Sequence, residues 1–206
     1  MPLRGDQIRC VGGEICAHIF ENERRNVPRQ LFWNVILHCT PVRWDGRDWS
    51  CSVLCDWLAW DITRWPDLDG ANLKSARRPE SVEGSFYFTD HHLLAVRSLE
   101  LRRIDKSCRF DISVAGSFDL RGFGDLDASD VRLAANCDVG FSGLIVVPEN
   151  LSGNPTTPEL ASAAASEFIE LADFGPPRWD RFRFVFEPKE RAAEGSRRRT
   201  SLKTVP

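Results

Sequence analysis

Most of the chain consists of short runs in which apolar residues occupy every second position, and turn residues separate these runs. The clearest run spans residues 109–120, where the apolar residues share one parity: Phe110, Ile112, Val114, Phe118 and Leu120. Because successive side chains of a strand point to opposite faces, this alternation predicts a strand with one buried face. Further strands are predicted by the runs at residues 14–20, 31–39, 50–60, 93–104, 131–147 and 180–188.

The run at residues 50–60 has a regular alternation and follows a turn. It places four large or buried-type residues on one side of an extended strand: Cys51, Val53, Cys55 and Trp57. Asp45-Gly46 precedes it, a dipeptide typical of tight turns. We therefore expect this strand to pair with the strand at residues 31–39, which is apolar on both faces and so predicted to be central in the sheet.

The stretch "SFYFTDHHLL" at residues 85–94 has two interpretations. Asp90, His91 and His92 match the ligand types of the phosphoesterases named for Asp-His-His, and residues 66–75 supply an earlier carboxylate group. The ligands of those enzymes lie on parallel strands, which require intervening helices, whereas only loop-like residues separate the two groups here. In a strand His91 and His92 also face opposite sides, so we predict the polar start of a strand.

One segment has the period of a helix. Thr157 is a suitable N-cap, Pro158 suits the first helical position, and Gly175 with the prolines after it marks the end. We predict a helix at about residues 158–173. Its apolar stripe is expected to dock on the sheet and consists of Leu160, Ala164, Phe168 and Leu171.

These elements predict an all-β fold, a mostly antiparallel sandwich or barrel-like structure, with one C-terminal helix. The domain interpretation is a β-rich first half at residues 1–65, a linker or long loop at 66–84, a β-rich second half at 85–188, and a disordered basic tail at 189–206. A shift of 78 positions aligns a few residues of the two halves, so a weak duplication and one compact domain both stay open.

Composition and charge narrow the environment and the partner. The chain has 206 residues, 42% of them hydrophobic, with no export signal and no apolar run long enough to span a membrane, so we expect a soluble cytoplasmic protein. The formal net charge is −3, but residues 189–206 carry six Lys/Arg against two Glu, a net +4, which leaves −7 on the body. An acidic body excludes a nucleic-acid surface on the folded part.

Metal and cofactor sites are not predicted. Cys51 and Cys55 would lie roughly 13 Å apart on an extended strand, too far for one zinc ion. None of the seven cysteines forms a Cys-x-x-Cys pair, so we expect reduced thiols, no disulfide, no zinc and no cofactor. The acidic turn at residues 124–130 departs from a calcium-binding EF-hand loop, which leaves a capped turn or a looser calcium site.

No sequence motif for catalysis is complete. Residues 140–144, "GFSGL", lack the second glycine of a nucleophile elbow, and the chain contains no phosphate loop and no dinucleotide fingerprint. Carboxylates on separate strands leave no local signature. A hydrolase therefore stays an alternative if a pocket brings together two or more of Asp56, Asp111, Asp119 and Asp138.

Tryptophan is concentrated in one part of the chain, with six of seven between residues 33 and 65. Trp44 and Trp49 flank the Asp45-Gly46 turn, and Trp65 begins the long connection. We interpret these three rings as a candidate binding surface, with the neighbouring carboxylates of Asp45, Asp48 and Asp67 attracting a basic target. The alternative is that the rings pin the sheet from inside the core.

The sequence thus favours a noncatalytic β-rich interaction protein that binds a protein partner, as a toxin-neutralising or assembly protein would. Enzyme activity is not expected. The alternatives are a hydrolase with dispersed carboxylates and a small-ligand carrier that uses the interior of a β-barrel.

Overall fold

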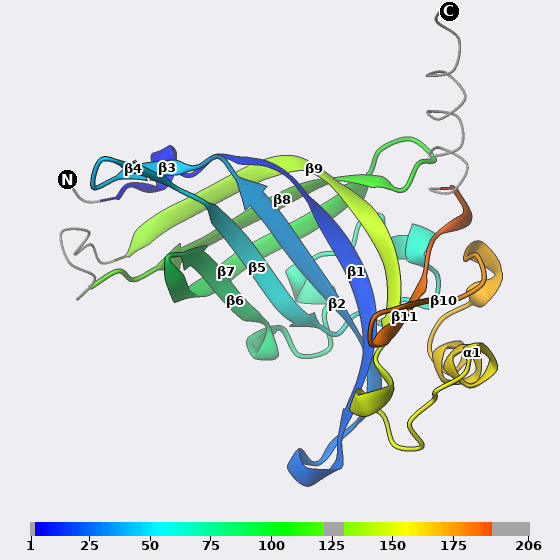
Figure 1. Cartoon of the computed structure of the whole chain (residues 1–206). Helices are drawn as coiled ribbons and strands as arrows, with labels where there is room; N and C mark the ends of the chain where they lie inside the picture. Colours follow the sequence, from blue (N-terminus) through cyan, green and yellow to red (C-terminus); the bar gives the residue numbers. More distant parts are fainter. Residues whose placement is uncertain (1–2, 122–129, 191–206) are drawn as a thin grey trace, which may run out of the picture.

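The structure, a computed structural model, describes residues 3–121 and 130–190. It is mostly β, with 53% of residues in strands, a closed seven-strand barrel and a single α-helix near the C-terminus, which confirms the predicted fold class (Figure 1). The basic tail, apart from residues 189–190, and the acidic turn, apart from Asp130, lie outside the described residues.

The elements follow one another in a simple order. The strands are β1 (Cys10–Asn22), β2 (Val27–Cys39), β3 (Val42–Trp44), β4 (Arg47–Trp49), β5 (Cys51–Leu58), β6 (Glu83–Phe88), β7 (Asp90–Arg103), β8 (Arg109–Phe118), β9 (Val131–Val146), β10 (Arg178–Asp180) and β11 (Arg183–Phe186). The helix is α1 (Pro158–Ser166). As predicted, the strand at residues 31–39 pairs with the strand that begins at Cys51.

The barrel closes through one parallel contact. Its strands lie in the order β1-β2-β5-β6-β7-β8-β9, each antiparallel to its neighbour, and β9 then pairs with β1 in parallel. Strands from both halves of the chain therefore belong to one closed sheet. The predicted linker at residues 66–84 connects β5 to β6, which are neighbours in this sheet, through short 3-10 turns.

The barrel interior is filled with side chains. Trp33, Phe86, Phe110 and Phe141 are fully buried, and the rings of Phe86 and Phe118 stack with centroids 4.4 Å apart. The interior of a barrel of this size is just wide enough for side chains. The described interior is thus a packed core, which gives no support to the carrier alternative.

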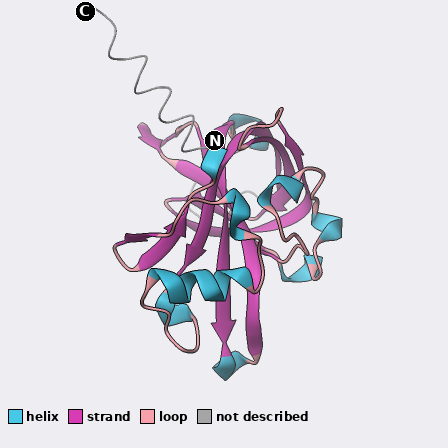
Figure 2. Cartoon of the chain, turned by 90° about the vertical axis from the view of Figure 1, so that its right-hand side faces the viewer, coloured by secondary structure: helices cyan, strands magenta, loops and turns pink. Residues whose placement is uncertain are grey.

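The helix begins as predicted and ends earlier. Thr157 Oγ1 accepts a hydrogen bond from the Leu160 N–H at 3.3 Å, and α1 ends at Ser166. Beyond it, the Glu170 N–H donates to the Thr63 carbonyl at 2.7 Å, a tertiary bond that replaces a further helical turn. α1 lies outside the barrel on the side of β10 and β11 (Figures 1 and 2). Its buried residues are Ala161, Ala164 and Ala165, so the predicted contact of Leu160 is wrong, since that side chain is 51% exposed.

The "SFYFTDHHLL" stretch forms the β6–β7 hairpin, which confirms the strand interpretation. Thr89 takes a left-handed φ of 60° at the turn. His91 is exposed and shares a 2.9 Å hydrogen bond with Ser85, whereas His92 Nε2 lies 3.2 Å from the Phe88 carbonyl. Within the part of the chain that the structure describes, no group of three or more His, Cys, Asp or Glu residues could hold a metal ion. No helix in this part is long and apolar enough to cross a membrane.

Candidate functional site

A groove of about 280 Å³ lies on the outer face of the barrel, and we call it the aromatic groove. Its floor is formed by Phe20 of β1, Phe32 of β2 and Trp57 of β5. Three charged residues form its rim. Arg25 lies in the β1–β2 turn, Arg78 lies in the segment before β6, and Glu83 is the first residue of β6. The tip of the β1–β2 hairpin projects beyond the barrel (Figure 1).

A β-bulge turns Trp57 into this groove. In the β2–β5 ladder Trp33 pairs with Leu58 and Val35 pairs with Cys55, so Asp56 and Trp57 together oppose the single residue Asn34. Asn34 Oδ1 accepts the Trp57 N–H at 3.3 Å, and Trp57 has a φ of 63°. The prediction that Trp57 shares the buried face of Cys55 is therefore wrong, because the extra residue sends Trp57 outward and Leu58 inward.

The rings around Trp57 pack edge to face. The centroids of Phe20 and Phe32 lie 5.0 Å from that of Trp57, and the His18 ring lies 5.4 Å away. The Trp57 indole N–H donates to Glu83 Oε2 at 3.2 Å, which fixes the orientation of the ring. Aromatic pairs in this arrangement are favourable beyond the area that they bury. The floor is therefore preformed.

His18 lies beneath the floor in an apolar environment. Its Nδ1 atom is buried and has no hydrogen-bond partner among the residues that the structure describes. Burial lowers the pKa of His18 to about 4, so the ring is neutral at pH 7. The unpaired nitrogen is a cost to the fold, because buried polar atoms normally have a hydrogen-bond partner.

The rim of the groove carries charges of both signs. Neither the Arg25 nor the Arg78 guanidinium forms an ion pair within residues 3–121 and 130–190. The acidic groups near the rim are Glu83 and Asp56. Burial raises the pKa of the Asp56 carboxyl to about 6, and the charge of Glu83 adds to this increase to a smaller extent. Two unpaired guanidinium groups give the groove a preference for an anionic group.

The structure places the tryptophans of the predicted surface differently. Trp44 and Trp49 lie on the β3–β4 hairpin, half-buried, and their centroids are 5.9 Å and 6.4 Å from that of Phe88. The Trp49 indole N–H donates to the Trp44 carbonyl at 3.1 Å. The two rings thus cover one end of the barrel, while Asp45 and Asp48 are exposed on the hairpin.

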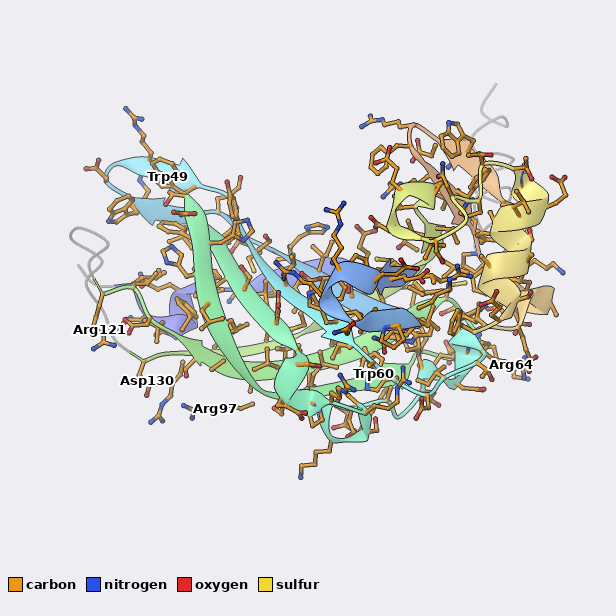
Figure 3. All side chains as sticks on the ribbon, turned by 90° about the horizontal axis from the view of Figure 1, so that it is seen from below. Trp49, Trp60, Arg64, Arg97, Arg121 and Asp130 are labelled. Atoms are coloured by element: carbon orange, nitrogen blue, oxygen red, sulfur yellow. The ribbon has the colours of Figure 1, made fainter. Side chains whose placement is uncertain are left out.

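Trp65 does not belong to this surface. It is 1% exposed, stacks on Phe141 with centroids 5.3 Å apart, and has the Arg103 guanidinium 4.6 Å above its ring. Asp67 is exposed beside it. Trp49 and Arg64, the residue before Trp65, lie at opposite ends of the molecule (Figure 3). The six predicted residues therefore do not form one surface, because the connection after β5 carries Trp65 into the core.

Two of the four candidate carboxylates come together. Asp111 of β8 pairs with Asp138 of β9 in the antiparallel ladder, and both line an open hollow of about 550 Å³ on the outer face. A hydrogen bond with Asp138 raises the pKa of Asp111, and Asp138 forms an ion pair with Arg109. Asp119 instead forms an ion pair with Arg121, and Asp56 lies near the aromatic groove.

Comparison with protein-family models, curated proteins and solved structures finds no match for this chain. The functional argument therefore depends on the geometry of the chain itself.

Sequence reasoning missed the aromatic groove. Its residues come from three separate segments, and only the barrel brings them together. One feature of the sequence pointed to it, namely that residues 31–39 are apolar on both faces of the strand. Phe32 lies on the outer face of this strand and is only 7% exposed. Apolar side chains on the outer face of a barrel strand are exposed to water unless another side chain packs on them, and Trp57 packs on Phe32.

Proposed function

We propose that the protein is a noncatalytic interaction protein that takes a segment of a partner protein into the aromatic groove. The observation that carries this proposal is Trp57, a large aromatic residue held at a positive φ by a β-bulge. A left-handed backbone costs a residue with a side chain about 1–2 kcal/mol. Such strain and such bulges are concentrated at functional sites, where they aim a side chain.

The size of the groove supports a protein segment as its occupant. A volume of about 280 Å³ is just below the usual range of small-molecule pockets and has room for only a few side chains. Protein interfaces derive most of their affinity from a few anchors that enter such hollows. The groove is therefore proposed to hold the anchor of a larger contact.

The charges of the rim define the chemistry of the segment. An apolar or aromatic anchor side chain would pack on Phe20, Phe32 and Trp57. A carboxylate beside it would pair with the Arg25 or Arg78 guanidinium, which favour bidentate contacts with carboxylates. This proposal replaces the basic target that we expected from the carboxylates near Trp44 and Trp65.

Selection from a random-peptide library on the immobilised protein tests the proposal. The counter-selection uses Trp57→Gly, because glycine adopts a φ of 63° without strain and removes only the ring. The matched control is Tyr87→Ala, which removes an aromatic ring that is 41% exposed elsewhere on the outer face.

We expect the enriched peptides to combine an aromatic or long aliphatic residue with an acidic one. Their affinity should fall at least tenfold on Trp57→Gly and stay unchanged on Tyr87→Ala, since a buried aromatic anchor contributes more than about 1.4 kcal/mol. Enrichment of peptides that bind Trp57→Gly as tightly as the wild type would contradict the proposal.

A hydrolase that uses Asp111 and Asp138 is the second candidate. It is favoured by the convergence of the two carboxylates in one hollow and by the raised pKa of Asp111, as in a pair that shares a proton. The test is hydrolysis of a panel of ester, glycoside and phosphate substrates by the wild type and by Asp111→Asn. Turnover that Asp111→Asn abolishes would support this candidate, whereas equal rates for both proteins would remove it.

A further inference from the structure

Three cysteines from three neighbouring strands lie side by side at the end of the barrel opposite the aromatic groove. Cys10 of β1 and Cys39 of β2 are direct partners in the antiparallel ladder. His38 pairs with Ser52 in the β2–β5 ladder, so Cys39 is level with Cys51. We call these residues the thiol row.

Two sulfur atoms of the thiol row are in contact, since Cys10 Sγ and Cys39 Sγ are 3.1 Å apart. The Cys51 thiol donates to the Thr40 carbonyl at 3.3 Å and is near enough to the Cys39 thiol for each to affect the pKa of the other. A disulfide bond is about 2.05 Å long, so the first pair needs a movement of only about 1 Å. The β1–β2 ladder is irregular between Cys10 and Gly12, at the end of the strand, where the backbone can adjust with little loss of pairing.

We propose that the thiol row is an oxidation site for a hydroperoxide, in which Cys39 is the central sulfur that bonds to Cys10 or to Cys51. The thiolate of Cys10 attacks the hydroxyl oxygen of the hydroperoxide, an S–O bond forms, the O–O bond breaks, and the leaving oxygen takes a proton as water or alcohol. The sulfur of Cys39 then attacks the sulfenic sulfur of Cys10, the S–S bond forms, the S–O bond breaks, and water leaves with the proton of Cys39. Two thiols are oxidised and one peroxide is reduced.

The third thiol, that of Cys51, allows thiol–disulfide exchange within the row. The thiolate of Cys51 attacks the sulfur of Cys39, a Cys39–Cys51 bond forms, the Cys10–Cys39 bond breaks, and Cys10 leaves as a thiolate. Each exchange conserves one disulfide and one thiol. The disulfide is therefore shared between two neighbouring strand pairs, with Cys39 in both.

Hydrogen bonding distinguishes Cys10 and Cys51 from Cys16 and Cys55, the other cysteines of the same two strands. The hydrogen bond from Cys39 lowers the pKa of Cys10 and of Cys51 and raises the pKa of Cys39, so Cys10 and Cys51 are favoured in the thiolate form that attacks a peroxide. Burial instead raises the pKa of Cys16 and of Cys55 to about 12. Cys39 is half-buried and Cys10 and Cys51 are buried on either side of it, so the thiol row reaches the surface at its central residue.

Peptide mapping of the full chain after treatment with hydrogen peroxide tests the proposal. Cys39 is the sole cysteine of the tryptic peptide 30–43, whereas Cys10 and Cys16 share peptide 10–24, and Cys51 and Cys55 share peptide 48–64. Remaining thiols are alkylated before digestion, and fragmentation of each linked peptide identifies the cysteine involved. This readout is independent of peptide binding, so it does not depend on the proposed function.

We expect peptide 30–43 to be linked to Cys10 or Cys51, with two fewer alkylated cysteines per chain. Cys39→Ser should lose the disulfide, Cys10→Ser should retain a Cys39–Cys51 bond, and the control Cys16→Ala should behave as the wild type. The proposal is overturned if peptide 30–43 is fully alkylated, if Cys39 is oxidised to sulfinic acid without a linkage, or if the disulfide joins other cysteines. Mapping of the wild type decides the question even if Cys39→Ser does not fold.

Discussion

Trp57 shows how one residue shapes this surface. The bulge turns its ring onto the outer face, which also carries the Asp56 carboxyl, and the ring packs edge to face against His18. Both of these titratable groups are partly removed from water. Burial favours the neutral form of each group, so the pKa of His18 is below its ordinary value and the pKa of Asp56 is above its ordinary value.

This pair predicts a specific dependence of stability on pH. The pKa of His18 is about 4 in the folded protein against an ordinary 6.5, so the unfolded state binds more protons between these values. The free energy of unfolding should therefore fall as the pH is lowered from 6.5 to 4, by up to about 3 kcal/mol from this group. Asp56 acts oppositely, since its pKa of about 6 exceeds the ordinary 3.8.

Urea unfolding at a series of pH values separates the two contributions. Asp56→Asn should steepen the loss of stability between pH 6 and pH 4, because Asp56 no longer offsets the His18 contribution. His18→Phe should remove that loss and leave a gain as the pH falls through 6. Parallel pH curves for the two variants would mean that neither group is buried as described.

At the scale of elements, the β3–β4 hairpin closes one end of the barrel. Its turn has the left-handed φ values that a tight hairpin needs, 50° at Asp45 and 72° at Gly46. Trp44 and Trp49 reach back from it to Phe88. The hairpin thus acts as a cover over the core, which matches the alternative in which these tryptophans pin the sheet.

Replacement of Trp49 by alanine should therefore destabilise the fold. We expect a loss of about 2 kcal/mol in the free energy of unfolding, less than for a fully buried tryptophan, because the side chain is half-buried. Arg47→Ala, an exposed position on the same strand, is the control and should change stability by less than about 0.5 kcal/mol. Equal stability of both variants would show that the hairpin does not pack on the barrel.

The elements also show what a sequence can predict. The strands and the helix start were predictable because alternation and capping are local properties, as at residues 109–120 and at Thr157. The bulge at Trp57 was not, because it depends on the register of β5 against Asn34. The thiol row was missed for the same reason, because Cys10, Cys39 and Cys51 become neighbours only through strand pairing. In the sequence, the nearest cysteine to Cys51 is Cys55, and only that pair was considered.

For the whole molecule, packing of the C-terminal strands on the barrel depends on a glycine at which two backbones approach closely. Gly143 in β9 has a φ of 128°, and a Cβ atom there would lie 2.3 Å from the Phe186 carbonyl oxygen of β11. Gly140, on the same strand, has open space where a Cβ atom would point. The two positions therefore test how tightly the C-terminal strands pack on the barrel.

We expect Gly143→Ala to lower the free energy of unfolding by about 2 kcal/mol or more, because the side chain meets backbone and the φ is unfavourable. Gly140→Ala should be close to neutral, within about 0.5 kcal/mol. Urea unfolding of both variants measures the difference. A result in which Gly140→Ala is the more damaging change would contradict the pairing of β9 with β11.

The packed barrel is best understood as a rigid support for the aromatic groove, and the claim that this groove binds a partner segment has one direct measurement. Titration of ¹⁵N-labelled protein with a peptide enriched in the library selection follows the seven tryptophan indole N–H signals separately. The account predicts that the Trp57 signal shifts with the binding curve, because its N–H bonds to Glu83 at the edge of the groove, while those of the buried Trp33 and Trp65 do not move. Saturable binding that shifts the Trp44 and Trp49 signals and leaves that of Trp57 in place would contradict it.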